Sequence, residues 1–199
     1  ELESKIAWCD VLAIGSGLGR EVETISAVSD IISKNKAKNI VIDADAIFAI
    51  GEVGYLNFDL KNKILTPHYG EFSHLLGITT EELQLNIITY GKEFVHKTKS
   101  YLVLKGAPTI IFLPNGDTII NSAGNSGMAK FGTGDVLTGV ITGLLSQTGN
   151  IENSVISGVY IHSLSADLLL NSETEFGITA TKIEENLPNA ISFLRNSII

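Results

Sequence analysis

The segment GNSGMAKFGTGDVLTG, residues 124–139, has the residue types and spacing that most directly indicate chemistry. It holds five glycines and one acidic residue, and an apolar helical pattern begins at its end. A helix N-terminus presents unpaired N–H groups and about half a positive charge. Gly132 and Gly134 would let the backbone approach a ligand closely. The segment therefore predicts an anion site suited to phosphate. The alternative is a tight turn followed by an aspartate that caps the helix.

Asp135, the acidic residue of this segment, has two candidate roles. As a cap it would accept backbone hydrogen bonds and stay ionised. Beside a phosphate site, the same carboxylate can accept the proton of a hydroxyl group that attacks phosphorus. A carboxylate is a weak base at neutral pH, but it suffices when the hydroxyl loses its proton late in phosphoryl transfer.

Further polar side chains follow the expected strands. Lys105 can neutralise nucleotide phosphates, or it is a surface lysine with a buried stem. Asp43 and Asp45 alternate at a strand end and are expected to point to one face. There they can hold Mg²⁺ or bond substrate hydroxyls, the alternative being a cap and turn pair. His68 is a candidate donor to a ligand or a surface group, and Glu71 is expected to cap the next helix.

The elements that must position these residues alternate between strands and helices. Short apolar runs bounded by glycine or proline predict buried strands at 11–14, 40–47, 63–68 and 101–106. Helical spacing of apolar residues predicts helices at 20–34, 80–98, 135–146, 153–170 and 181–196. Asn115-Gly116 between two β-branched runs predicts a β-hairpin. The order predicts an α/β fold with a mostly parallel central sheet flanked by helices, and ligands at the carboxyl ends of its strands.

Composition restricts the classes of function. The chain has 199 residues, 44% of them hydrophobic, so a single domain over residues 1–199 is expected. The net charge of −8 argues against nucleic acid or an anionic membrane as a partner. Cys9 is the only cysteine, which excludes an intrachain disulfide and favours a cytoplasmic location. No Cys/His spacing indicates a metal site, and GSGLGR lacks the spacing of a dinucleotide fingerprint.

Several segments in fixed order resemble one known family. AIGSGLG, VIDADAI, TPHYGEFSHLLG, VLKGAPTIIFLPNG and GNSGMAKFGTGDVLTG are together similar to the NAD(P)H-hydrate dehydratases of the ribokinase-like superfamily. The later segments GVYIHSLSADLLL and FGITATKI are similar too, so the resemblance covers nearly the whole chain. It implies a ribokinase-like fold.

The resemblance implies removal of water from the hydrated nicotinamide ring of NADHX or NADPHX, with ADP or ATP as phosphoryl donor and Mg²⁺ bridging the phosphates. The ring hydroxyl would be phosphorylated with Asp135 as base, and amides of Gly132, Thr133 and Gly134 would stabilise the transferring group. The implied nucleotide-binding residues are Lys105, Gly106, Ala107, Pro108, Thr109, Asn125, Ser126, Gly127, Met128, Ala129, Lys130, Phe131, Gly132, Thr133 and Gly134. The predicted substrate-binding residues are Gly19, Asp43, Asp45, His68, Glu71 and Asp135.

The chain departs from the family pattern in three places. Ser16 stands where the family usually has proline, and Lys130 and Phe131 stand where it usually has threonine and glycine. Lys130 is expected to add charge to the nucleotide pocket, and Phe131 to narrow it or stiffen the loop. The family domain normally begins with a further strand and glycine-rich turn. ELESKI resembles the end of a helix, so the N-terminal part of the usual domain is expected to be missing.

The family also implies a homo-oligomer and an NAD(P)HX epimerase as a fused or separate partner. Two other functions are compatible with the residues. One is a ribokinase-like small-molecule kinase of the hydroxymethylpyrimidine or thiazole kinase type, whose product stays phosphorylated. The other is a non-catalytic nucleotide-binding module.

Overall fold

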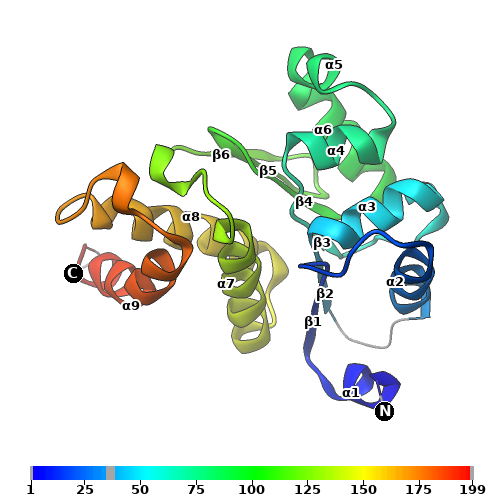
Figure 1. Cartoon of the computed structure of the whole chain (residues 1–199), viewed down its shortest axis with the longest axis horizontal. Coiled ribbons are helices and arrows are strands. Elements are labelled where there is room, and N and C mark those ends of the chain that lie inside the picture. The colour runs from blue at the N-terminus through cyan, green and yellow to red at the C-terminus, as the bar shows by residue number, and fades with distance from the viewer. Residues whose placement is uncertain (1, 35–38, 198–199) are drawn as a thin grey trace. The chain divides into compact units, whose positions relative to one another are not determined.

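The structure, a computed structural model, describes residues 2–34 and 39–197. Contacts within the chain divide it into two compact units, Glu1–Ile120 and Asn121–Ile199. The first unit contains the sheet and the helices that connect its parallel strands, and the second contains the three C-terminal helices (Figure 1). A single domain over 1–199 stays a prediction.

The first unit is built on one sheet. Among the described residues, six strands pair in the order β1-β2-β3-β4-β5-β6. They are β1 Val11–Ile14, β2 Asn39–Ile42, β3 Ile64–Leu65, β4 Tyr101–Leu104, β5 Thr109–Phe112 and β6 Thr118–Asn121. Strands β1 to β4 run parallel and β5 is antiparallel to β4. The predicted mostly parallel sheet is confirmed, and β5 and β6 are neighbours joined by the short turn at residues 113–117, as the predicted hairpin requires.

Helices connect the parallel strands (Figure 1). The connecting helices are α2 Val22–Lys34, α3 Ala44–Val53, α4 Tyr69–Leu76, α5 Thr80–Leu85 and α6 Ile87–Thr98, and α1 Leu2–Trp8 precedes β1. Helix α1 occupies the segment expected to be helical at the start of the chain, and α2 begins two residues after its expected start.

Three expected elements have different boundaries. The strand expected over 63–68 is limited to β3, Ile64–Leu65. The strand expected over 40–47 ends at Ile42 because α3 begins at Ala44. An apolar run of this length fits either a buried strand or a buried helix. The prediction of a strand beyond Ile42 was therefore wrong. The helix expected over 80–98 is two helices, because Asn86 has the non-helical angles φ −137° and ψ 34°. Asn86 stands at the C-cap of α5 and the N-cap of α6, and its side chain makes no capping hydrogen bond to α6.

One apolar cluster joins the sheet to these helices. Successive side chains of a strand point to opposite faces, and Ile40 and Ile42 of β2 lie on the face that carries the cluster. Helix α3 contributes Ile47 and Ile50, which are fully buried. This cluster fixes where each strand ends relative to the helix that follows it.

The second unit is helical after residue 121. Its main elements are α7 Thr133–Thr148, α8 Ile151–Leu169 and α9 Ala180–Ser197, with short 3-10 turns at Ser126–Met128 and Glu175–Gly177. The three predicted helices are confirmed with ends shifted by at most two residues. A Cβ on Gly158 of α8 would lie 2.9 Å from Ile141 Cγ1 of α7, so a glycine lets these two helices approach closely. Among the residues described, none of the helices combines the length and apolar character needed to span a bilayer.

Candidate active site

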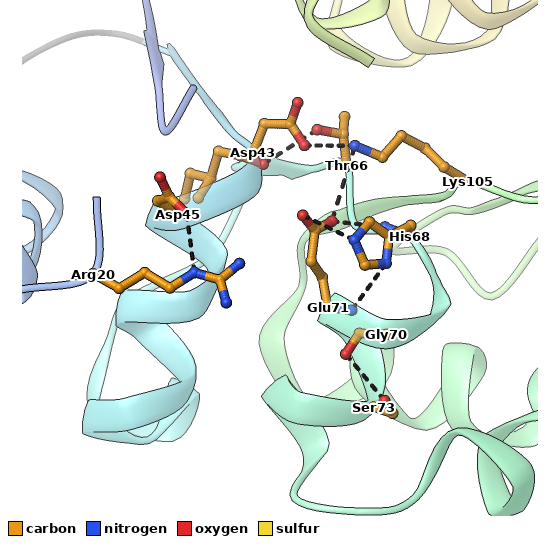
Figure 2. A network of polar contacts seen from close by, with 10 residues as sticks. Arg20, Asp43, Asp45, Thr66, His68, Gly70, Glu71, Ser73 and Lys105 are labelled. Carbon is orange, nitrogen blue, oxygen red and sulfur yellow. Dashed lines mark hydrogen bonds and ion pairs between the residues drawn. The ribbon is translucent and has the colours of Figure 1, made fainter. Parts of the chain in front are cut away.

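The first group of predicted site residues lies where four parallel strands of the first unit end. Backbone bonds continue the strand pairing past these ends: Asp43 N–H donates to Ile14 O over 3.0 Å. Thr66 N–H likewise donates to Ile42 O over 3.1 Å. Lys105 N–H donates to Pro67 O over 2.7 Å. The predicted location of the polar segments at the carboxyl edge of the sheet is therefore confirmed (Figure 2).

Asp43 and Asp45 do not point to one face of a strand, as the sequence predicted. Asp43 is the residue before α3, and Asp45 lies in the first turn of that helix. Their spacing therefore follows the helix and not the two-residue period of a strand. The Asp43 side chain is 2% exposed, and its Oδ1 accepts from Lys105 Nζ over 2.8 Å.

Asp45 holds the glycine-rich loop that follows β1. Its Oδ2 accepts from Gly19 N–H over 2.9 Å and its Oδ1 accepts from Arg20 Nε over 3.1 Å. The guanidinium of Arg20 also lies 4.5 Å from the centre of the Phe48 ring. Figure 2 shows Arg20 and Asp45 pointing toward one another. Asp45 is therefore placed to orient the backbone around Gly19, which is a predicted substrate-binding residue.

His68 and Glu71 form a reciprocal cap at the start of α4. Glu71 N–H donates to His68 Nδ1 over 3.2 Å, and His68 N–H donates to Glu71 Oε2 over 2.8 Å. The predicted capping role of Glu71 is confirmed. Because Nδ1 accepts this bond, the neutral imidazole carries its proton on Nε2. The side chain of His68 is 58% exposed, and its Nε2 lies 3.3 Å from Glu71 Oε1, so both ring nitrogens face Glu71.

Lys105 begins the turn between β4 and β5, which also contains Gly106, Ala107 and Pro108, and Thr109 is the first residue of β5. Its ammonium lies 2.8 Å from Asp43 Oδ1 and 3.9 Å from Glu71 Oε2 (Figure 2). Part of its charge is therefore balanced inside the first unit. The use of residues 105–109 in nucleotide binding stays a prediction.

Replacing Lys105 with methionine should reveal this pairing in the free energy of unfolding. The Asp43 carboxylate is almost fully buried and would lose its lysine partner. We expect a loss of about 2–3 kcal/mol, below the range for fully buried pairs because Lys105 is 20% exposed. Urea denaturation measures the change. The control is Lys97→Met, which removes a half-exposed pair with Glu93 and should cost less than about 0.5 kcal/mol. Equal losses in the two variants would contradict the assignment.

The second group of predicted residues lies in the second unit, around the start of α7. Gly132 is the residue before the helix, with φ 87° and ψ −14°, a left-handed conformation that glycine adopts without strain. Val136 N–H donates to Gly132 O over 3.0 Å, and Thr133 N–H donates to Lys130 O over 3.4 Å. The first N–H groups of a helix have no partner within the helix itself. Asp135 is not the cap residue, because it is the third residue of the helix and is exposed to solvent. The N-cap residue of α7 is therefore Gly132 and not Asp135.

The loop before α7 is shaped by Asp167, a residue that sequence reasoning missed. Asp167 of α8 accepts from Gly124 N–H over 2.7 Å and from Asn125 Nδ2 over 3.0 Å. Asn125 Oδ1 in turn accepts from Gly127 N–H over 3.0 Å and caps the turn Ser126–Met128. Asp167 lies 42 residues or more from its partners in sequence, so no local pattern indicated its role.

Thr133 closes this loop onto the helix. Its hydroxyl donates to Met128 O over 2.8 Å and lies 2.9 Å from Lys130 O. The residues Asn125, Ser126, Gly127, Met128, Ala129, Lys130, Phe131, Gly132, Thr133 and Gly134 are therefore continuous with the helix start.

The side chains of Lys130 and Phe131 differ in their contacts and in their exposure to solvent. The ammonium of Lys130 is bonded to backbone carbonyls of residues 175, 176 and 178. These three carbonyls of the second unit therefore bind the ammonium. The sequence had led us to expect that Lys130 adds charge to the nucleotide pocket. The Phe131 ring is fully exposed.

The carboxylates of the first group do not fit a protein-held Mg²⁺. Among residues 2–34 and 39–197, no three His, Cys, Asp or Glu side chains are grouped as a metal site would need. Asp43 is bonded to Lys105, and both oxygens of Asp45 accept from Gly19 and Arg20. Mg²⁺ carried on nucleotide phosphates needs only one or two protein carboxylates, so the arrangement is compatible with that mode.

Known proteins resemble this chain over most of its length. A bifunctional NAD(P)H-hydrate repair enzyme of Thermofilum pendens is 37% identical over 187 residues, which are 94% of this chain and 36% of the relative. The solved ADP/ATP-dependent NAD(P)H-hydrate dehydratase of Bacillus subtilis, co-crystallised with ATP and Mg²⁺, is 30% identical with a TM-score of 0.80. The match covers 96% of this chain and 69% of that one. The chain thus spans about a third of the first relative and about two thirds of the second.

The fold and the family follow from these matches. A ribokinase-like superfamily protein of Enterococcus faecalis has a TM-score of 0.83 and 32% identity, over 96% of this chain and 66% of that one. This confirms the ribokinase-like α/β fold. A family model described as NAD(P)H-hydrate dehydratase matches residues 1–189, which include both groups of site residues. A match of this extent, together with relatives of 30% identity or more, shows that the chain belongs to the NAD(P)H-hydrate dehydratase family.

Proposed function

We propose that this chain carries an ADP- or ATP-dependent NAD(P)H-hydrate dehydratase activity. The hydroxyl of the hydrated nicotinamide ring attacks the terminal phosphoryl group of the nucleotide. The ring then loses phosphate and a proton, which restores NADH or NADPH. The observation that carries the proposal is the exposed Asp135 in the first turn of α7, three residues after the left-handed Gly132. The name of the Bacillus subtilis relative, an ADP/ATP-dependent NAD(P)H-hydrate dehydratase, supports an adenine nucleotide as the donor.

The second unit would supply the phosphoryl-transfer groups. Asp135 takes the proton of the ring hydroxyl as the oxygen–phosphorus bond forms. The amides of Gly132, Thr133 and Gly134, at the positive end of α7, stabilise the charge of the transferring group. Mg²⁺ bound to the nucleotide phosphates would neutralise part of their charge. The loop from Asn125 to Phe131 would contact the rest of the nucleotide.

The first unit would hold the hydrate. We assign this to the backbone around Gly19, which Asp45 orients, and to His68, which Glu71 orients. The side chain of His68 is 58% exposed, so its imidazole ring can contact the substrate. The bond between Lys105 and Asp43 joins the ends of the strands that carry these groups.

We also propose the setting of the reaction. The Thermofilum pendens relative is a bifunctional repair enzyme, which supports an NAD(P)HX epimerase as a fused or separate partner. The single cysteine, together with the need for an adenine nucleotide, supports the cytoplasm. The homo-oligomer implied by the family stays a prediction, which light scattering on the purified protein measures.

Incubation with NADHX and either ADP or ATP tests the proposed function. We expect the absorbance of the reduced nicotinamide ring to rise, with AMP formed from ADP or ADP formed from ATP. A stable phosphorylated product without recovery of the reduced ring would favour the small-molecule kinase. Nucleotide binding without turnover of NADHX or NADPHX would favour the non-catalytic module.

A further inference from the structure

The side chain of Lys130 lies in an unusual environment for a surface lysine. Its Nζ donates to Phe176 O and Ile178 O, each over 2.6 Å, and to Glu175 O over 3.3 Å. One ammonium thus meets three backbone carbonyl oxygens of a single short segment. An ammonium has three donors and no acceptor, so this set matches its bonding capacity.

The backbone of Lys130 belongs to the loop that leads into α7. Its carbonyl oxygen lies 2.9 Å from the Thr133 hydroxyl oxygen, and its N–H donates to Met128 O over 2.8 Å. Lys130 therefore connects two parts of the second unit: the loop of residues 125–132 and the segment of residues 175–178. Residues 130 and 178 are 48 positions apart in sequence.

A second observation shows how closely these two parts approach. A Cβ on Gly127 would lie 2.8 Å from Glu175 O and 2.9 Å from Ile178 Cδ1. The glycine thus allows the loop backbone to lie against the segment that the ammonium binds. Lys182 also binds this segment, through Gly177 O over 3.0 Å, but its other partner is Glu173 and not the loop.

We propose that Lys130 is a positioning residue for nucleotide binding, whose ammonium serves as a built-in cation that joins the carbonyls of 175, 176 and 178 to the loop of residues 125–132. The inference rests on the proposed function, in which this loop and the start of α7 bind the nucleotide. A loop already held in its binding conformation loses less conformational entropy when the ligand binds. Without the ammonium, three carbonyls must find other donors and the loop loses its anchor.

The test compares Lys130→Ala with Lys182→Ala in the full chain. Hydrogen exchange reports the loop without any ligand, and we expect faster exchange over 125–134 in Lys130→Ala only. Calorimetry with ADP and with ATP reports binding, and we expect Kd to rise about tenfold in Lys130→Ala, because ordering the loop then opposes binding, and to stay within about twofold in Lys182→Ala.

Chemical rescue separates positioning from general stability. Methylammonium chloride should restore nucleotide affinity to Lys130→Ala more than sodium chloride at the same ionic strength, because a small ammonium can occupy the three carbonyls. Unchanged exchange over 125–134, or equal loss of affinity in both variants, would overturn the proposal. If the unmodified chain bound neither ADP nor ATP, the proposed function would fail, and the role of Lys130 in nucleotide binding would fail with it. The exchange data would still show whether it anchors the loop.

Discussion

Replacing Asp135 with asparagine lowers the turnover of NADHX by a factor of about 100 or more, the usual contribution of a general base. Asparagine has nearly the same size and shape, so the loop and α7 keep their geometry, but its amide cannot accept the proton of the ring hydroxyl. Because Asp135 is exposed in the first turn of α7, the substitution buries no new polar group. Initial rates with saturating ADP or ATP measure the effect.

The matched control for this prediction is Glu152→Gln. Glu152 lies in the first turn of α8, so its loss removes the same charge from an equivalent helix position. Both substitutions should cost about 0.3–1 kcal/mol in the free energy of unfolding, through the helix dipole. Only Asp135→Asn should lower turnover. A rate in Asp135→Asn within a few-fold of the unmodified chain would remove Asp135 from the role of base.

Replacing Gly15 with alanine destabilises the first unit by about 4 kcal/mol or more, in the range that marks a clash that cannot be relieved. Gly15 follows β1 and has φ 139°. A Cβ at this position would lie 1.7 Å from Asp43 O and 3.2 Å from Ala46 Cβ. The obstacle is backbone at the end of β2, so no side-chain rotation can remove it. The midpoint of urea denaturation, with the slope held common, measures the loss.

Gly17→Ala is the control, because it lies in the same loop and also has a positive φ, of 66°. Nothing lies within 4 Å of a Cβ there, so only the left-handed backbone opposes the change, at about 1–2 kcal/mol. Similar midpoints for the two variants would show that the loop can move away from Asp43. In that case the loop would not be a fixed support for the backbone around Gly19.

The two groups of site residues differ in how far local sequence indicated them. The start of α7 was predictable because glycines, a hydroxyl residue and an acidic residue stand directly before an apolar helical pattern. The cap formed by His68 and Glu71 was predictable because both residues lie within one turn. Asp43 and Asp45 were assigned to a strand, because apolar residues precede and follow them and a short apolar run fits either kind of element.

The sequence by itself determined the alternating order of elements, the parallel sheet with its terminal hairpin, and the position of glycines and polar residues at the strand ends. These follow from periodicity and turn chemistry, which act over a few residues. Only the tertiary structure decided which charges are paired. Lys105 and Asp43 are 62 residues apart, and Lys130 and Ile178 are 48 apart, yet each pair lies within 3 Å. The path of the folded chain brings such partners together, because the burial of apolar side chains fixes that path and the polar groups then bind whatever lies beside them.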